Sequence, residues 1–338
     1  MSTNPVVKIL VVGPAWIGDM VMAQSLFKRL RQRYPSALID VLAPAWSAPI
    51  LQRMPEVHQC VEQPLGHGRL AIGRRYQLGK SLRSVNYDLA VVLPRSYKAA
   101  LVPFFAKIKH RVGYRGELRY GVINDIRPLD KSVLTQTVQR FTALGEAPDA
   151  PLPPSILPPT LNIDRNNAER LLRELDLQTD KPVVGLMPGA EYGPAKCWPY
   201  YAQLARQLTQ KDCYVWIFGS EKDRSGGDDI AQGNSQVRNL CGSTQLADAV
   251  DLLSLPQAVV CNDSGLMHIA AAVGQHVIAI YGSSTPDYTP PLSDKATVLY
   301  EGLECSPCFK RRCPLGHTNC LNNISVERVL SALDRIDR

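Results

Sequence analysis

The chain has 338 residues, of which 45% are hydrophobic and 20% are charged, and its formal net charge is +7 at pH 7. This length suits about two domains, and the composition is that of an ordinary soluble globular protein. No run of about 18 or more apolar residues occurs, which excludes a typical membrane-spanning helix. The first residues lack the basic and apolar segments of a signal peptide, so we expect a cytoplasmic protein.

The positive charge is concentrated in the first part of the chain. Residues 1–150 hold 21 Lys and Arg against 10 Asp and Glu, a net charge of +11, whereas the remainder carries −4. This excess favours an anionic partner, and nucleic acid, anionic lipid headgroups and a phosphorylated glycan all fit it. Lysines that are scattered over the surface and simply solvated are the alternative.

Predicted strands and helices alternate along the chain, which favours parallel sheets with helices on both faces. In the first half we predict strands at Lys8–Gly13, Leu38–Ala43 and Asp88–Leu93, and helices at Met20–Tyr34 and Leu78–Ser84. In the second half we predict strands at Val183–Met187, Tyr214–Phe218, Ala258–Cys261 and Val277–Tyr281. The helices predicted there are Asp164–Leu175, Tyr200–Thr209, Gln245–Leu253, Leu266–Val273 and Ser325–Arg338.

A proline-rich segment separates the two halves. Pro148–Pro159 carries six prolines in twelve residues, which fits neither a helix nor an inner strand and is typical of a semi-rigid linker. We therefore predict an α/β fold with two doubly wound, Rossmann-like domains facing across a cleft. The predicted domains are 1–155 and 160–323, followed by a C-terminal helix at 324–338 that packs across the cleft. Ligands of such sheets bind at the carboxyl ends of the strands.

The stretch Val183–Pro199 has the succession of strand, loop and helix that is typical of a phosphate-binding site. An apolar strand is followed by the Pro188-Gly189 turn, a loop with one isolated cation, Lys196, and the start of a helix. Free amide groups and the helix dipole at such a start favour an anion. An ordinary strand-to-helix connection is the alternative.

Two further loops follow predicted strands of the second half. One carries Glu221 and Asp223, and the other runs Asn262-Asp263-Ser264-Gly265 into a helix that contains His268. Asp263 or Ser264 would also suit a helix N-cap, and His268 would suit a buried core position. The chain has neither a G-x-G-x-x-G nor a D-x-D sequence, which disfavours a nicotinamide cofactor and a metal–nucleotide carrier. Converging polar strand ends favour a nucleotide-like ligand.

The most basic segment of the chain is Arg95–Lys131, with nine Lys and Arg against three Asp and Glu. Aromatic residues interleave with these cations, a mixture that binds either single-stranded nucleic acid or a phosphorylated sugar. Nothing in the segment matches a known nucleic-acid module, so we expect no nucleic-acid partner. We predict that Arg95, Lys98, Arg115 and Arg119 contact the anionic partner of this half.

Five segments together resemble the ADP-heptose glycosyltransferases, glycosyltransferase family 9. They are KILVVGPAWIGDMVMAQSLFKRL, RGELRYGVINDIRPLDK, PGAEYGPAKCWP, VVCNDSGLMHIAAA and YGSSTPDYTPPLS, and they run in order from Lys8 to Ser293. The resemblance implies a GT-B fold with an N-terminal acceptor domain and a C-terminal donor domain. It also implies metal-independent, inverting transfer of L-glycero-D-manno-heptose from ADP-heptose to the first heptose of the Kdo-lipid A inner core.

The resemblance assigns roles to individual residues. Asp19 matches the base that takes the acceptor proton, although an N-cap of the following helix is the alternative, and Lys196 matches the cation that stabilises the departing diphosphate. Donor contacts are predicted at Gly18, Glu191, Tyr192, Glu221, Asp223, Asp263, Ser264, Gly265 and His268. Glu191 and Tyr192 stand where relatives carry hydroxyl side chains. By analogy with carboxylates of other nucleotide-binding folds, and not from the resemblance, Glu221 or Asp223 would hold the adenosine ribose.

A cluster of cysteines follows these segments. The cluster provides the types of ligand that a structural zinc or iron–sulfur site needs, although their spacing is not a standard one: Cys305, Cys308, Cys313, His317 and Cys320. A disulfide or redox pair and free thiols are the alternatives. The remaining five of the nine cysteines are expected to be structural.

An enzyme is the leading interpretation, and it requires no cofactor for catalysis. The alternatives are the family's enzyme that adds the first heptose, and a non-catalytic protein of the same fold that binds a nucleotide sugar or glycan. The basic first half suits an anionic acceptor, heptosyl-Kdo-lipid A. It would also hold the protein peripherally on the cytoplasmic face of the inner membrane.

Overall fold

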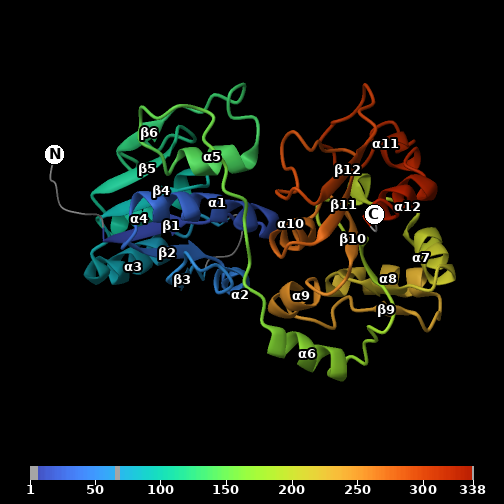
Figure 1. Cartoon of the computed structure of the whole chain (residues 1–338). Helices are drawn as coiled ribbons and strands as arrows, with labels where there is room; N and C mark the ends of the chain where they lie inside the picture. The colour runs from blue at the N-terminus through green and yellow to red at the C-terminus, as the bar shows by residue number, and fades with distance from the viewer. Residues whose placement is uncertain (1–6, 65–68, 337–338) are drawn as a thin grey trace. The chain divides into compact units, whose positions relative to one another are not determined.

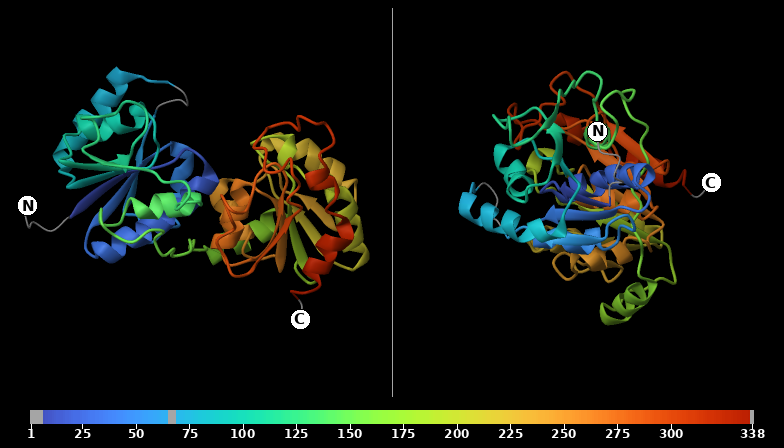
Figure 2. Two further views of the ribbon diagram at one scale, coloured as in Figure 1. Left: turned by 90° about the horizontal axis from the view of Figure 1, so that it is seen from above. Right: turned by 90° about the vertical axis from the view of Figure 1, so that its left-hand side faces the viewer.

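The computed structural model describes residues 7–64 and 69–336. The chain divides into two compact units, Met1–Pro159 and Thr160–Arg338, called unit 1 and unit 2 below. Each unit contains one parallel sheet with helices on both faces (Figures 1 and 2). Among the described residues, no helix is both long and apolar enough to cross a membrane.

The sheet of unit 1 has the strand order β3-β2-β1-β4-β5-β6. Its strands are β1 (Lys8–Val12), β2 (Leu38–Ala43), β3 (Gln59–Glu62), β4 (Leu89–Val92), β5 (His110–Tyr114) and β6 (Asp125–Arg127). The central strands β1, β2 and β4 are almost entirely buried, as continuous apolar runs in a doubly covered parallel sheet require. The direction of the strand order reverses between β1 and β4, which is the position where such sheets bind ligands.

The helices of unit 1 are α1 (Ile17–Arg33), α2 (Ala48–Leu51), α3 (Ile72–Ser81), α4 (Tyr97–Phe105) and α5 (Thr137–Ala143).

Helix α1 begins earlier than the sequence pattern predicts. Since the N-cap of α1 is Trp16, Asp19 lies inside the first turn rather than in a loop, and the N-cap alternative for Asp19 is wrong. An acidic side chain is favourable in this turn because it faces the positive end of the helix dipole.

The proline-rich segment is held against unit 1 at its end. Ser25 on α1 donates a hydrogen bond of 2.7 Å from its hydroxyl to the carbonyl of Leu157, and Lys28 donates one of 2.6 Å to the carbonyl of Pro158. The two units divide directly after these contacts. The predicted bounds and roles of the two domains stay predictions.

The sheet of unit 2 has the strand order β12-β11-β10-β7-β8-β9 and repeats the plan of unit 1. Its strands are β7 (Val183–Met187), β8 (Tyr214–Ile217), β9 (Val237–Asn239), β10 (Ala258–Asn262), β11 (His276–Tyr281) and β12 (Ala296–Tyr300). Its helices are α6 (Arg165–Glu174), α7 (Tyr201–Gln210), α8 (Arg224–Ala231), α9 (Leu246–Leu252), α10 (Gly265–Ala272), α11 (Asn319–Asn322) and α12 (Val326–Leu333). Here the order reverses between β7 and β10.

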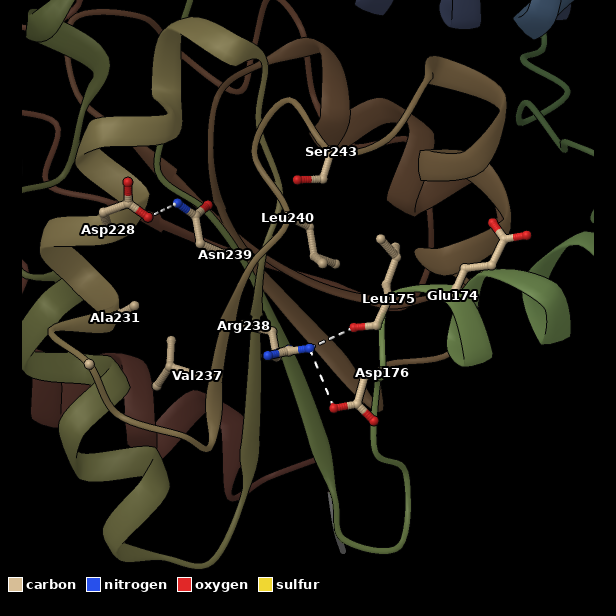
Figure 3. Close-up of a pocket in the computed structure, with 11 residues that line it drawn as sticks. Glu174, Leu175, Asp176, Asp228, Ala231, Val237, Arg238, Asn239, Leu240 and Ser243 are labelled. Atoms are coloured by element: carbon tan, nitrogen blue, oxygen red, sulfur yellow. Dashed lines mark hydrogen bonds and ion pairs between the residues drawn. The ribbon is translucent and has the colours of Figure 1, made fainter.

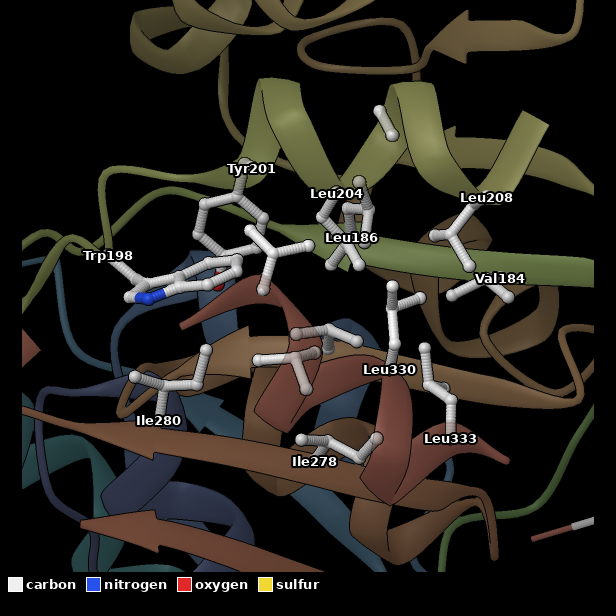
Figure 4. Close-up of a cluster of buried hydrophobic side chains, with 14 of the residues drawn as sticks. Val184, Leu186, Trp198, Tyr201, Leu204, Leu208, Ile278, Ile280, Leu330 and Leu333 are labelled. Carbon is white, nitrogen blue, oxygen red and sulfur yellow. The ribbon is translucent and has the colours of Figure 1, made fainter. Parts of the chain in front are cut away.

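One hydrophobic core joins β7, β11, α7 and the last helix, α12 (Figure 4). Tyr201, Leu204 and Leu208 lie on one face of α7 at helical spacing, and Leu330 and Leu333 of α12 are buried in the same cluster. Fully burying a large apolar side chain contributes about 1.5–3 kcal/mol, so α12 is firmly part of unit 2. Its predicted packing across a cleft stays a prediction, and residues 337–338 of the predicted helix lie outside the described residues.

Candidate functional site

Four loops of unit 2 meet at the carboxyl edge of its sheet. They follow β8, β7, β10 and β11, which are neighbours in that order, and they flank the reversal between β7 and β10. Asn262, the last residue of β10, links two of them. Its side-chain nitrogen donates to the carbonyl of Pro188 at 2.7 Å, and its side-chain oxygen accepts from the backbone N–H of Trp198 at 3.0 Å. Asn262 therefore fixes the loop after β7 against the end of β10.

Lys196 and Asp263 form an ion pair at this reversal. The ammonium of Lys196 contacts Oδ2 of Asp263, and their side chains are only 15% and 6% exposed. The hydroxyl of Ser284, from the loop after β11, donates to the same carboxylate oxygen at 2.6 Å. Lys196 is thus not the isolated cation that the sequence suggests. Its partner lies 67 residues away along the chain but on a neighbouring strand end.

Tyr192 lies beside this ion pair and between two cations. Its ring centroid is 5.1 Å from Nζ of Lys196 and 5.4 Å from the guanidinium carbon of Arg311. Its hydroxyl donates a hydrogen bond of 2.6 Å to the carbonyl of Phe309. The predicted donor contact at Tyr192 is untested, but its contacts place the ring at the site and bring in a second cation.

The segment that carries Arg311 is bound to the loop after β7. The backbone N–H of Ala195 donates to the carbonyl of Arg311 at 3.1 Å. Gly193 has a φ of +139°, and a Cβ built there would lie 2.7 Å from that same carbonyl oxygen. Only glycine fits this approach. Arg311 is not among the residues predicted from the sequence, because cysteines dominate its segment, although the run Lys310-Arg311-Arg312 is a signal for an anion-binding position.

Ser264 and Gly265 begin helix α10 at the same edge. Ser264 is the N-cap by backbone position, but its hydroxyl makes no capping hydrogen bond. Among the described residues, the buried hydroxyls of Ser264 and Ser283 are without a hydrogen-bond partner. Unpaired buried hydroxyls cost free energy, which a polar ligand at this helix start would recover. Local capping therefore does not explain the Ser264 side chain.

His268 lies one turn further along α10 and is buried. Burial lowers the pKa of His268 to about 4, with nearby Lys196 acting in the same direction and Asp263 opposing both. Its imidazole is therefore neutral at pH 7 and offers a hydrogen bond rather than a positive charge. Both the ligand interpretation and the core interpretation of this histidine agree with its burial.

The titration of His268 predicts a pH dependence of stability. The unfolded chain binds a proton below the ordinary pKa of 6.5, whereas the native imidazole stays neutral down to about pH 4. The contribution of His268 to the free energy of unfolding is therefore fully present above pH 6.5. It is lost as the pH falls toward 4, and the loss amounts to about 3 kcal/mol. We expect denaturant titrations at pH 7 and 4.5 to show a smaller loss for His268→Gln than for the wild type. The partly exposed His276→Gln is the control, and identical losses in all three proteins would contradict the prediction.

The acidic residues of the two loops after β7 and β8 are held by local partners. Glu191 accepts an ion pair of 3.0 Å from Lys222, and Glu221 accepts one of 2.8 Å from Arg224. Asp223 accepts hydrogen bonds of 2.8 and 2.7 Å from the backbone N–H and the hydroxyl of Ser220, in the capping box of a short helical turn. These contacts fix the loops, and the donor-binding roles of the three carboxylates stay predictions.

In unit 1, the predicted residues follow β1, β4 and β5, and the strand order reverses between β1 and β4. Gly18 is buried and Asp19 half-buried in the first turn of α1, directly after β1. Arg95 follows β4, and a Cβ at Gly116 would clash with its carbonyl oxygen, so the loops after β4 and β5 are in contact. Arg115 is exposed on the second of these loops and Lys98 lies in the first turn of α4. Their acceptor contacts stay predictions.

Arg119 is a correction to the predicted acceptor site. Its side chain is 1% exposed, and its guanidinium donates to the carbonyl of Pro94 at 2.8 Å and to the carbonyl of Tyr114. These bonds tie the ends of β4 and β5 together beneath the surface. We therefore assign Arg119 a structural role, because its guanidinium is buried and donates to two backbone carbonyls.

The four clustered cysteines are free thiols of different exposure. Cys320 is buried in the core of unit 2, whereas Cys305 is exposed and Cys308 and Cys313 are half-buried. Backbone N–H groups of residues 315–318 lower the pKa of the Cys313 thiol. Within 7–64 and 69–336, no group of three or more His, Cys, Asp or Glu has the arrangement of a metal site. The predicted structural metal gains no support from the geometry.

A pocket of about 580 Å³ lies elsewhere in unit 2, beside the edge strand β9 (Figure 3). Arg238 crosses it and donates to the carbonyl of Leu175 at 2.8 Å, with its ion pair to Asp176 at 3.6 Å. None of the catalytic, donor-binding or acceptor-binding residues predicted from the sequence lines this pocket. It is therefore separate from the site at the strand ends.

Comparisons with known proteins agree with this architecture. The chain is 47% identical to lipopolysaccharide heptosyltransferase 2 of Escherichia coli, over 97% of this chain and 98% of that protein. It is 46% identical to lipooligosaccharide heptosyltransferase 2 of Haemophilus influenzae, over 97% and 99%.

Solved structures give the same result. The structure of the E. coli ADP-heptose LPS heptosyltransferase II superposes with a TM-score of 0.86 at 43% identity, covering 97% of this chain and 98% of that one. The E. coli heptosyltransferase WaaC with ADP shares the fold, with a TM-score of 0.71 at 19% identity over 97% and 99%. The model of glycosyltransferase family 9 (heptosyltransferase) matches residues 75–319. The chain therefore belongs to glycosyltransferase family 9, the heptosyltransferases.

Proposed function

We propose that this protein moves L-glycero-D-manno-heptose from ADP-heptose to the first heptose of the Kdo-lipid A inner core, with inversion at the sugar carbon. The Lys196–Asp263 pair carries the proposal, since it places a cation beside unpaired serine hydroxyls at a strand-order reversal. Such a site suits the diphosphate of a nucleotide sugar. Relatives at 43–48% identity are named lipopolysaccharide or lipooligosaccharide heptosyltransferase 2, and a solved relative is an ADP-heptose LPS heptosyltransferase II, which supports heptose transfer from ADP-heptose.

In the proposed step, unit 2 holds the donor and unit 1 the acceptor. The carboxylate of Asp19 takes the proton of the acceptor hydroxyl, whose oxygen bonds to the heptose carbon opposite ADP. The bond from that carbon to the diphosphate oxygen breaks, and its electron pair leaves with ADP. Lys196 and the amides at the start of α10 stabilise the charge that develops there. The neutral His268 donates or accepts one hydrogen bond, and the step needs no metal or other cofactor.

Two alternatives remain distinguishable by experiment. Heptosyltransferase 1 of Pseudomonas aeruginosa is a more distant relative at 24% identity, and a non-catalytic binding protein would share the fold. We expect ADP release from ADP-heptose only when the acceptor already carries one heptose. Release with an acceptor that lacks heptose would support the first alternative. Binding of ADP-heptose without release on either acceptor would support the second.

We also propose that the protein works on the cytoplasmic face of the inner membrane, in peripheral contact with its anionic surface. The acceptor is lipid-anchored and carries acidic groups, and residues 1–150 carry a net charge of +11. Basic surfaces bind anionic leaflets with about 1 kcal/mol for each lysine or arginine near the surface. Nucleic acid is not part of this proposal.

A further inference from the structure

Helices α3 and α4 of unit 1 pack against each other (Figure 1). They leave several apolar side chains in solvent. Ile72 and Tyr76, one turn apart on α3, are 51% and 43% exposed, and Phe104 at the end of α4 is 40% exposed. Leu70, just before α3, is also exposed. Single exposed apolar residues are common, but contiguous ones mark contact surfaces.

These side chains belong to one connected surface. The rings of Tyr76 and Phe105 pack edge to face with centroids 5.3 Å apart, and those of Phe105 and Phe104 follow at 5.6 Å. Cations continue the row at both ends. The guanidinium of Arg83 lies 5.9 Å from the Tyr76 ring, and that of Arg111 lies 5.6 Å from the Phe104 ring.

The charge of this surface has a single sign. Residues 69–85 and 97–111 contain nine Lys and Arg and no Asp or Glu. Arg75, Arg83 and Arg111 donate to backbone carbonyls and so serve the fold. The exposed cations are Arg69, Arg74, Lys80, Lys107 and Lys109.

We propose that this α3–α4 surface docks the protein on an anionic lipid bilayer. Aromatic and aliphatic side chains enter the headgroup boundary while lysines and arginines contact the headgroups, as in interfacial helices. Aliphatic Ile72 and Leu70 favour lipid over nucleic acid, since bases stack on rings rather than on branched chains. The inference rests on the proposed function in one respect, because a lipid-anchored acceptor requires such a surface.

Vesicle binding tests the surface without relying on catalysis. The probe is phosphatidylcholine vesicles with and without 30% phosphatidylglycerol, in a flotation assay on the full chain. We expect Arg74→Glu/Lys109→Glu to weaken binding to the anionic vesicles by at least about tenfold. Ile72→Gln/Phe104→Gln should weaken it as well, and none of these proteins should bind the neutral vesicles strongly.

The matched controls are exposed residues of unit 2. Arg165→Glu/Arg173→Glu on α6 makes the same change of charge, and Leu255→Gln/Val298→Gln makes the same change of polarity. We expect both to bind like the wild type. Equal vesicle binding by all variants would overturn the proposal. It would also be overturned if the α3–α4 variants lost binding to a single-stranded RNA probe while they bound the vesicles like the wild type.

Transfer to a soluble acceptor separates this inference from the proposed function. A heptosyl-Kdo oligosaccharide without acyl chains needs no membrane, so Arg74→Glu/Lys109→Glu should use it at the wild-type rate. If the wild type binds anionic vesicles through this surface but transfers no heptose to any acceptor, the proposed function fails and the docking surface stands. If the wild type transfers heptose and the variants bind vesicles like the wild type, the proposed function stands and the docking surface fails.

Discussion

Replacing Asp19 with Ala is expected to slow heptose transfer by about 100- to 10,000-fold while ADP-heptose still binds, because a positioned general base contributes this much. The residue lies in the first turn of α1 at the strand-order reversal of unit 1, where an acceptor hydroxyl would meet it. The first-turn acid itself contributes only about 0.3–1 kcal/mol to the helix, so the variant should fold. Turnover is measured by ADP release, and donor binding by calorimetry.

Two further variants sharpen this test. Asp19→Asn keeps the shape of the side chain and removes its basicity, so it should be nearly as slow as Asp19→Ala. Glu327→Ala removes the first-turn acid of α12, far along the chain in unit 2, and should transfer normally. Near-normal transfer by Asp19→Asn would remove the base assignment, and weakened donor binding would point instead to a role in holding ADP-heptose.

The fold was largely predictable because its central strands are continuous apolar runs. Val183–Met187 and Leu38–Ala43 have the predicted bounds, and alternation with helices is enough to predict two parallel sheets. The strands that were missed lie at or near sheet edges. Asp125–Arg127, with the sequence DIR, is only three residues long and partly exposed, so it lacks a readable pattern. Helix α4 was not predicted because Pro103 stands inside it, where proline normally disfavours a helix.

The candidate site was predictable only as a set of loops. Strand-end loops of a parallel sheet share an edge, and this rule gathered Lys196, Asp263 and His268 correctly at one end of unit 2. It did not predict which groups neutralise each other. The pairing of Asp263 with Lys196 is visible only once the strand order is known. The burial of Arg119 and the contact of Arg311 with the Tyr192 ring are visible only in the packed structure.

Lys196→Ala is expected to reduce turnover by about 100- to 1,000-fold, as loss of a preorganised charge-stabilising donor does, and to weaken donor binding. It should also destabilise the protein by about 3–5 kcal/mol, because Asp263 keeps a buried carboxylate without its cation. The exposed Lys211→Ala breaks a surface ion pair with Asp334, away from the predicted donor contacts, and should change neither activity nor stability appreciably.

A double variant separates the two effects of Lys196. Lys196→Met/Asp263→Asn removes both buried charges while keeping their volumes, so most of the lost stability should return, as measured by denaturant unfolding. Transfer should stay low, since the diphosphate still lacks its cation. Recovery of transfer together with stability would mean that Lys196 serves only to neutralise Asp263. Low transfer in a stable double variant, together with near-normal transfer by Asp263→Asn alone, places the cation in the reaction itself, and the ion pair then holds Lys196 ready for the donor.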